Sequence, residues 1–343
     1  MGDVRGMASI DEQYSMKVSE AVKELSAIQG DSTLNILYVT DLHHRCGGNQ
    51  LRAARAVREL AGRLELDAIL NGGDIGTNGL KLDVVAAQRE IVGELSVEGV
   101  PLLTVKGNHD DNSIYDHDHR TGTADQVIFP SESREIMLSG LEGVARFDEN
   151  RPDSLYYYVD IPDKNTRIIV LDCIDIPYIV KDSGELKQNG QWEYAFSAEQ
   201  LSWVVGVALD LLDKPEWRVL IVSHVPILQE GIVGTDHPVA SGERMWELIR
   251  AFRDGEGQFA RQGPRTVIGC LFGHVHIDQF VYRDGIPWIS TLNAWTNQDF
   301  PDTPERLEGT MSETAFDILT VDFEQSMMRF YRFGAGEHRK AVF

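Results

Sequence analysis

Two histidines lie two positions apart in the segment LFGHVHID, which spans residues 271–278. In an extended strand, side chains at positions i and i+2 point to the same face. His274 and His276 could therefore hold a metal ion together, crowd one another in a core, or close a strand at the surface. Because histidine is an ordinary partly buried residue, the pair alone leaves these three alternatives open.

Further side chains that can bind metals follow four other apolar segments of strand length. Asp41 and His43 come after residues 34–40, Asp74 after 67–71, Asn108 after 100–105, and His224 after 217–223. In an α/β sheet the carboxyl ends of parallel strands meet along one edge, where ligands bind. We therefore expect all seven side chains to meet in space, with the histidine pair as one corner of a polynuclear metal site.

The types of these side chains narrow the choice of metal. Carboxylates, imidazoles and one amide, without any thiolate, suit Mn²⁺, Fe²⁺ or Fe³⁺, and Zn²⁺, whereas Ca²⁺ prefers a site richer in oxygen. Seven ligands are too many for one ion. Two ions about 3.5–4 Å apart that share one carboxylate would use all of them.

The elements that must position these side chains alternate between two hydrophobic patterns. Strand-like apolar runs at 34–40, 67–71 and 100–105 are separated by helical periodicity at 51–64 and 82–95. This βαβαβ order predicts parallel strands with helical crossovers. Later elements are expected as strands at 154–161, 166–172, 217–223 and 266–272, and as antiparallel strands at 279–283, 286–291, 316–322 and 328–333.

Three further segments complete this pattern. Residues 11–29 carry apolar side chains at helical spacing, which predicts an amphipathic leading helix. A helix is expected at 197–212, opened by a capping box of Ser197 and Gln200. The polar stretch 108–135 directly follows candidate ligands and is expected to be a functional loop.

Composition and charge exclude several classes of function. The chain has 343 residues, of which 42% are hydrophobic and 25% charged, as in soluble globular proteins. A formal net charge of −22 disfavours extended nucleic acid and anionic membranes as partners, while local cations could still admit a small anionic substrate. Cys46, Cys173 and Cys270 lie far apart, which favours a reducing compartment. Because no apolar stretch is typical of a signal peptide or a membrane span, a cytoplasmic location is expected.

Five short motifs stand in a fixed order at these strand ends: DLH (41–43), GD (73–74), GNHD (107–110), SH (223–224) and GHVH (273–276). In this order they resemble the calcineurin-like metallophosphoesterase superfamily, over about residues 34–295. The resemblance implies a four-layer α/β/β/α sandwich, with two mixed β-sheets flanked by helices. We expect an N-terminal helix or extension over residues 1–30 and a single metallophosphoesterase domain over residues 31–343. The family's second motif often reads GDxxD, and Thr77 in the last place here can alter the electrostatics of the site.

The resemblance also implies a role for each side chain. Two overlapping sets would each hold one ion: Asp41, His43, Asp74 and His276 for the first, and Asp74, Asn108, His224 and His274 for the second. Asp74 would thus bridge both ions. His109 would not be a ligand, but would lie beside the substrate, oriented by Asp110, and help the leaving oxygen depart.

These roles describe hydrolysis of a phosphate ester by in-line attack of a metal-bridging hydroxide, without a covalent enzyme intermediate. A small-molecule phosphodiester is the favoured substrate, and Arg45 and Asn293 could contact its phosphate. The alternatives are a phosphomonoesterase or nuclease of the same fold and a non-catalytic metal-bound scaffold. The presence of His109 and Asp110 argues against a scaffold, and the lack of a long Lys or Arg cluster argues against a nuclease. The C-terminal segment 330–343 resembles those of bacterial and phage-associated members.

Other histidines have more ordinary interpretations. His44 would point away from its neighbour His43, and would pack or support the site. His117 and His119 could form a third metal site, but a solvated acidic loop is the favoured interpretation. His237 could line the pocket or lie on a surface loop.

Overall fold

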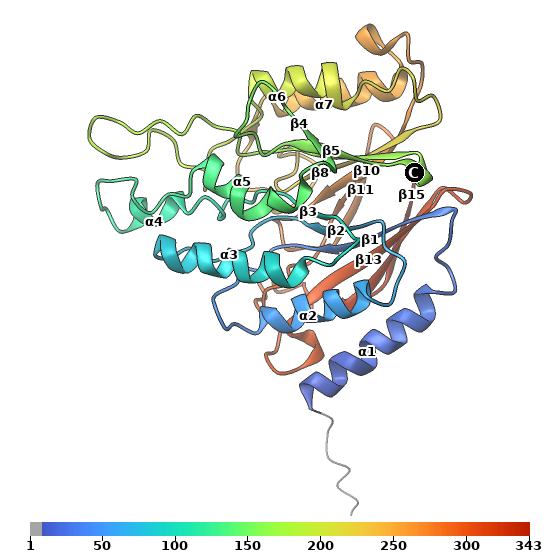
Figure 1. The fold of residues 1–343 in the computed structure, drawn as a ribbon, viewed down its shortest axis with the longest axis horizontal. Helices are drawn as coiled ribbons and strands as arrows, with labels where there is room; N and C mark the ends of the chain where they lie inside the picture. Colours follow the sequence, from blue (N-terminus) through green and yellow to red (C-terminus); the bar gives the residue numbers. More distant parts are fainter. Residues whose placement is uncertain (1–8) are drawn as a thin grey trace, which may run out of the picture.

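Residues 9–343, which the computed structural model describes, form two β-sheets packed face to face (Figure 1). The first sheet has six strands, in the order β15 (Arg339–Val342), β14 (Met327–Gly334), β13 (Ala315–Asp322), β1 (Thr33–Val39), β2 (Ala68–Asn71) and β3 (Leu102–Thr104). The second has seven, in the order β11 (Gln279–Arg283), β12 (Ile286–Ser290), β10 (Thr266–Phe272), β8 (Arg218–Ser223), β6 (Thr166–Val170), β5 (Tyr157–Ile161) and β4 (Ala145–Phe147). A separate short pair joins β7 (Tyr194–Ala195) and β9 (Val239–Ala240).

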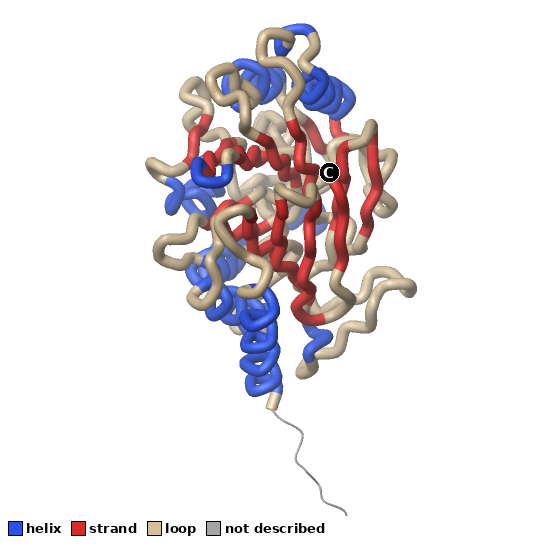
Figure 2. The backbone as a smooth tube through the Cα atoms, turned by 90° about the vertical axis from the view of Figure 1, so that its right-hand side faces the viewer, coloured by secondary structure: helices blue, strands red, loops and turns tan. Residues whose placement is uncertain are grey.

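Helices cover the outer faces of both sheets. The first sheet is covered by α1 (Ile10–Leu25), α2 (Gln50–Ala61) and α3 (Lys81–Leu95), and the second by α6 (Ala198–Trp203) and α7 (Gly242–Asp254) (Figure 1). Figure 2 shows the strands in the middle of the molecule, with helices above and below them. In the chain, α4 (Ser113–Asp118) and α5 (Pro130–Leu138) lie between β3 of the first sheet and β4 of the second. This arrangement confirms the predicted four-layer α/β/β/α sandwich.

Both sheets are mixed. Strands β1, β2 and β3 run parallel, as do β6, β8, β10 and β12, whereas the remaining ladder contacts of the two sheets are antiparallel. The predicted parallel βαβαβ unit and the late antiparallel strands are therefore both present. The strands that carry the candidate ligands are divided between the two sheets, with β1, β2 and β3 in the first and β8 and β10 in the second. The edge that gathers the ligands is therefore formed by both sheets.

The apolar core fills the space between the sheets and continues under the helices. Along β8, Leu220 and Val222 belong to the cluster between the sheets, whereas Val219 and Ile221 belong to the cluster beneath α6 and α7. Side chains alternate along a strand, and both faces of β8 are buried, so the strand reads as an uninterrupted apolar run.

Helix α1 is attached to the first sheet by an apolar stripe and a polar contact. Its buried side chains recur every three or four residues: Tyr14, Val18, Ala21 and Leu25. The Tyr14 hydroxyl donates to the buried Glu313 (3.0 Å), which also accepts two hydrogen bonds from Arg52 (2.7 and 2.8 Å). The helix ends at Leu25 rather than near residue 29. Residues 1–8 of the predicted extension lie outside the described residues, and the division at residue 30 stays a prediction.

Two local expectations need correction, and one helix was missed. The stretch 108–135 is not one loop, because it contains α4 and the first turn of α5. The helix expected at 197–212 is α-helical only to Trp203 and continues as a π-helical turn over Val204–Ala208. At its start the Ser197 hydroxyl accepts from the main-chain N–H of Gln200 (3.0 Å), which is one half of the expected capping box. The other half is not formed, because the Gln200 side chain bonds to the main chain of Asp172 (3.0 and 2.8 Å). Helix α7 was not predicted.

Candidate metal centre

All seven predicted ligands lie in loops that follow the carboxyl ends of strands. The loops after β1, β2 and β3 carry four of them, and the loops after β8 and β10 carry the other three. The C-terminal edges of these two groups of strands meet between the sheets. Side chains separated by more than two hundred positions in sequence are therefore brought into contact, as the sequence predicted.

The ligand loops follow strained backbone paths. Five of the seven predicted ligands have positive φ angles, between 43° and 65°: Asp41, His43, Asp74, His274 and His276. This region is disfavoured for residues with a Cβ, and such strain is concentrated at functional sites. Close backbone approaches also require glycine: a Cβ on Gly73 would lie 2.6 Å from Nδ1 of His224, and one on Gly107 would lie 2.2 Å from the main-chain nitrogen of Asp74.

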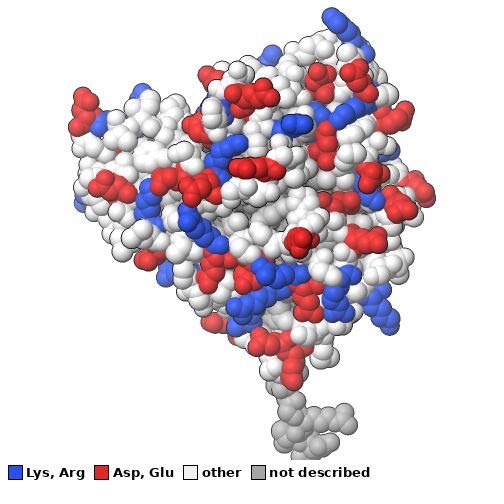
Figure 3. Space-filling model, in the orientation of Figure 1, with Lys and Arg blue, Asp and Glu red and all other residues white. Residues whose placement is uncertain are grey.

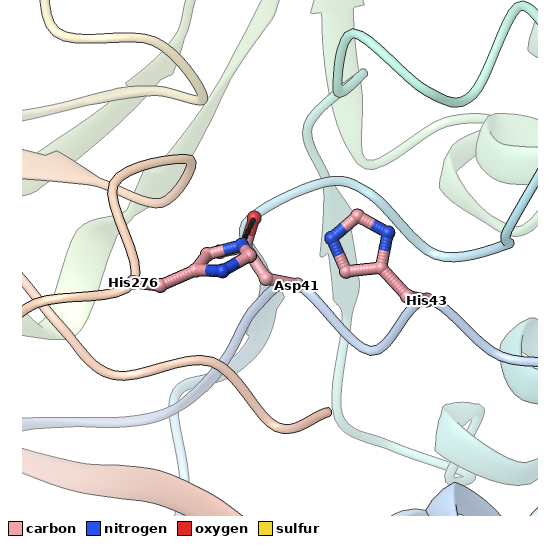
Figure 4. Close-up of side chains that lie close together, drawn as sticks. All are labelled: Asp41, His43 and His276. Carbon is pink, nitrogen blue, oxygen red and sulfur yellow. Dashed lines mark ion pairs between the residues drawn. The ribbon is translucent and has the colours of Figure 1, made fainter. Parts of the chain in front are cut away.

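Three overlapping groups of side chains could each hold a metal ion. Within each group the ligand atoms lie within 4.8 Å of one another: Asp41, His43 and His276; His43, Asp74 and His109; and Asp74, His224 and His274. Figure 4 shows the first group, in which Asp41 lies between two imidazole rings that come from different loops. Asn108 joins the third group, because its Oδ1 lies 3.1 Å from Nε2 of His224 and 3.0 Å from Nδ1 of His274.

Two histidines use one ring nitrogen inside the centre and the other on an outer carboxylate. His276 directs Nε2 to Oδ1 of Asp41 (3.2 Å) and Nδ1 to the carboxylate of Asp299. His274 directs Nδ1 inward and Nε2 to Oδ1 of Asp236 (2.9 Å). An outer carboxylate fixes the orientation of a metal-binding imidazole and makes its inner nitrogen more basic.

The partners of the ring nitrogens in the other two histidines, His224 and His43, indicate whether this centre suits a metal ion. His224 hydrogen-bonds through Nδ1 to the main-chain carbonyl of Gly72 (2.8 Å), which leaves Nε2 3.3 Å from Oδ2 of Asp74. His43 is buried, and its Nε2 has no hydrogen-bond partner although it lies 3.7 Å from the same oxygen. A buried polar atom without a partner is costly. A cation between His43 and Asp74 would satisfy it, so these residues fit a metal ion.

The charges of the centre are strongly coupled. Burial opposes a charged imidazole at His276, but the Asp41 and Asp299 carboxylates outweigh it and raise the pKa of His276 to about 10. Although burial acts the other way, His276 holds the pKa of Asp41 at about 2. Burial dominates at His43 and lowers its pKa to about 3. The carboxylates thus stay ionised in a buried place and demand positive charge beside them, which divalent ions supply.

His109 lies at the rim of the centre and is partly open to solvent. Its main-chain N–H donates to Oδ1 of Asp74 (2.8 Å), and its Nε2 lies 3.9 Å from Oδ2 of the same carboxylate. Its Nδ1 contacts the side-chain oxygen of Asn78, and its Nε2 lies 3.1 Å from the amide nitrogen of Gln191. Because 28% of the side chain is exposed, the ring can meet a substrate that approaches from outside.

The contacts of Asp110 differ from the expectation that it orients His109. Its carboxylate accepts hydrogen bonds, 2.8–3.0 Å long, from three main-chain N–H groups: those of Asp74, Ile75 and Gly107. Asp110 therefore ties the loops after β2 and β3 together. Burial raises its pKa to about 7. Within the described residues, the side chain on Nδ1 of His109 is Asn78 instead.

Four side chains of the site were missed by sequence reasoning: Asn78, Gln191, Asp236 and Asp299. Only Asn78 had a signal, because it lies four positions after Asp74 in the same loop. Asp236 and Asp299 come from irregular segments that no strand pattern places near the centre.

The remaining histidines have the ordinary contacts expected of them. His44 is buried and hydrogen-bonds to Glu90 (2.7 Å), so it packs outside the centre. His117, His119 and His237 are exposed, and the metal-binding groups found among the described residues include none of them.

Comparison with known proteins places this geometry in a family. The sequence matches calcineurin-like phosphoesterases over residues 34–278. The chain belongs to this family. It is 23% identical over 284 residues to the manganese-dependent ADP-ribose/CDP-alcohol diphosphatase of Xenopus laevis, an alignment that covers 74% of each protein. A crystal structure of a dimetal phosphatase from Danio rerio is similar in fold, with a TM-score of 0.55 and 17% identity over 90% of this chain and 99% of that one.

As a calcineurin-like phosphoesterase, the chain is a hydrolase that acts on phosphoric ester bonds, and His and Asp clusters that can bind metal lie at its centre. Figure 3 shows Lys and Arg interspersed with Asp and Glu on one face, without a continuous basic track. No helix within residues 9–343 is both long and apolar enough to cross a membrane.

Proposed function

We propose that this phosphoesterase hydrolyses a small-molecule phosphodiester at a centre of two metal ions. The observation that carries the proposal is Asp74, whose Oδ2 lies 3.7 Å from Nε2 of His43 and 3.3 Å from Nε2 of His224, so that its carboxylate can bridge two ions. The first ion would be held by Asp41, His43, Asp74 and His276, and the second by Asp74, Asn108, His224 and His274. Mn²⁺ is the favoured metal, because the relative from Xenopus laevis is manganese-dependent; Fe and Zn²⁺ suit the same ligands.

The ions, when bound, neutralise phosphate oxygens and lower the pKa of the attacking water. The chain's own residues then decide geometry and proton transfer. His109 is proposed to act as an imidazolium: its Nδ1–H donates to the side-chain oxygen of Asn78, and its Nε2–H gives a proton to the leaving oxygen, which leaves the ring neutral. Asn78 would hold the ring in this orientation, and Gln191, 3.1 Å from Nε2, would yield its place to the leaving oxygen.

A diphosphate is a second candidate substrate. The relative's name describes a diphosphatase that acts on ADP-ribose and CDP-alcohol, in which the phosphorus also carries two substituents. Both candidates are small and anionic, so the ions rather than the acidic surface would attract them. A monoesterase, a nuclease and a scaffold are the alternatives, and a cytoplasmic location and a bacterial origin stay predictions.

The deciding experiment is an assay of the Mn²⁺-loaded protein on an aryl phosphodiester, the matching monoester, a CDP-alcohol and single-stranded DNA. Hydrolysis of the diester or the CDP-alcohol well above the other two supports the proposal. Faster hydrolysis of the monoester or of DNA would reassign the substrate. A protein that binds two ions but hydrolyses none of the four would point to the scaffold.

A further inference from the structure

A cavity of about 480 Å³ opens directly beside His109. Its walls come from two segments that leave the sheets on the same side of the molecule: the region of α4 and the long loop that follows β6 (Figure 1). The two segments are joined to each other, since the Ser113 hydroxyl donates to the side-chain oxygen of Asn189 (2.7 Å). We call this space the aromatic cavity, defined by Asn78, His109, Ile114, Tyr115, Asp118, His119, Gln191 and Trp192.

The lining of the aromatic cavity suits a flat, uncharged group. Tyr115 and Trp192 present ring surfaces, Ile114 adds an aliphatic contact, and Asp118 stands at the rim. Among the described residues that line it there is no Lys or Arg; its polar groups include two amides, two imidazoles and the Asp118 carboxylate, which would repel an anionic group. Trp192 is 40% exposed, which is typical of an aromatic side chain that binds a partner rather than the core.

Both rings are held in place before any ligand arrives. His119 stacks on Tyr115 with ring centroids 4.0 Å apart, and His117 meets Trp192 edge to face at 5.0 Å. Supporting contacts of this kind reduce the conformational entropy lost on binding. They also give His117 and His119 a place in the molecule that does not involve metal.

We propose that the aromatic cavity binds the leaving group of the substrate, and that this leaving group carries a planar aromatic or heterocyclic ring. The inference rests on the proposed function, in which His109 contacts the leaving oxygen. A group attached to that oxygen must extend from His109, and the space that begins at His109 is walled by Tyr115 and Trp192. The ring of the leaving group would stack on Tyr115 and Trp192 and stay bound while the ester bond is broken.

A second cavity, of about 470 Å³, adjoins the aromatic cavity and contains a cationic side chain that an anionic part of the substrate could contact. It shares Asn78 and Tyr115 with the aromatic cavity and contains Arg45. Within residues 9–343 the Arg45 guanidinium has no ion pair or hydrogen bond, so it is available to an anion. Asp83 lines the second cavity as well, so this cavity carries one charge of each sign, whereas the aromatic cavity has no Lys or Arg among its lining residues.

The test uses the full-length protein loaded with Mn²⁺ and two diesters, methyl phenyl phosphate and methyl hexafluoroisopropyl phosphate. Their leaving groups have similar acidity, but only phenol is planar. Release of methyl phosphate is followed by ³¹P NMR. Trp192→Ala should lower kcat/KM for the phenyl ester by about 5-fold to 100-fold, the range for loss of one stacking contact. The fluoroalkyl ester should change by less than about twofold.

Three further variants make the result specific. Trp192→Phe keeps a ring and should retain most of the phenyl preference, whereas Tyr115→Leu should reduce it. Tyr282→Ala removes another exposed aromatic side chain, on β11, and should leave kcat/KM for both esters unchanged. If Trp192→Ala lowers kcat/KM equally for both esters, or for neither of them, the leaving-group inference is overturned while the proposed phosphodiesterase activity stands. If the wild-type protein hydrolyses neither of these esters nor the aryl diester and CDP-alcohol of the first assay, the proposed function itself fails.

Discussion

Asp299 provides the sharpest test of the metal centre, because it lies outside the predicted ligand set. Its carboxylate contacts Nδ1 of His276, whose Nε2 faces Asp41 at 3.2 Å. In Asp299→Asn the amide oxygen can still accept from Nδ1–H, but the negative charge that makes Nε2 a stronger donor to metal is gone. We expect the ion held by His276 to bind more weakly, while the other ion is retained.

The expected loss of metal affinity in Asp299→Asn follows from the position of the carboxylate. Loss of an outer partner of a metal-binding histidine typically costs about 10-fold to 100-fold in metal affinity. Asp299 is 30% exposed, so solvent already screens part of its charge, and the lower end, about 10-fold or about 1.4 kcal/mol, is expected. Asp299→Ala removes the acceptor as well and should approach the upper end.

The assay is equilibrium dialysis against graded Mn²⁺, followed by elemental analysis of the ions bound per chain. The matched control is Asp302→Asn, which removes the same charge from an exposed position three residues away. Asp236→Asn, the equivalent change behind His274, should weaken the other ion. Unchanged Mn²⁺ binding by Asp299→Asn, or an equal loss in Asp302→Asn, would refute a supporting role for this carboxylate.

Three other predictions test the site and the fold. Asp74→Ala should lose both ions, since the bridging carboxylate serves each, whereas His276→Ala should mainly weaken one; full metal content in the Asp74 variant would contradict the bridging assignment. His109→Asn should keep its metal and KM while kcat falls by about 10²–10⁴, with a smaller deficit for a nitrophenyl ester, whose leaving group needs little protonation; an equal deficit for good and poor leaving groups would contradict this role. Although burial opposes the shift, hydrogen bonds from Arg167 and Lys214 lower the pKa of Asp160. The ionised Asp160 carboxylate therefore stabilises the fold above about pH 3.9, and this stabilisation is lost as the pH falls through the lowered pKa. Asp160→Asn should therefore lower the free energy of unfolding by about 1–3 kcal/mol at pH 7 but less at pH 3, as measured with urea; an equal loss at both pH values would exclude the ion pair as the cause.

The strands and the convergence of the seven candidate ligands could be predicted because both leave local signals. Buried parallel strands read as apolar runs, and a ligand that must face an ion at the strand end follows within a few residues, as Asp41 follows β1. The division into two sheets could not be read from the same runs. On β8 alternate residues belong to different core clusters, yet all are apolar, so the pattern does not reveal which sheet a strand joins.

The outer partners were unpredictable for a different reason. Asp236 and Asp299 lie in segments without periodicity, and their approach to His274 and His276 depends on how distant loops pack. The role expected of Asp110 failed in a related way. Sequence adjacency suggested contact with His109, but the turn directs the carboxylate to the main chain of the loops after β2 and β3.

That use of Asp110 accounts for how the strained centre can persist. Positive φ angles at residues such as Asp41, Asp74 and His276 are unfavourable, and the buried carboxylates repel one another, so the loops would relax if nothing held them. The ladder between β1 and β2 fixes where the loops begin, and Asp110 joins the loop after β2 to the loop after β3. The scaffold therefore bears the strain, and the ligands are held ready for the ions. Metal binding then adds stability to the folded state, because ions that bind only this arrangement shift the folding equilibrium toward it.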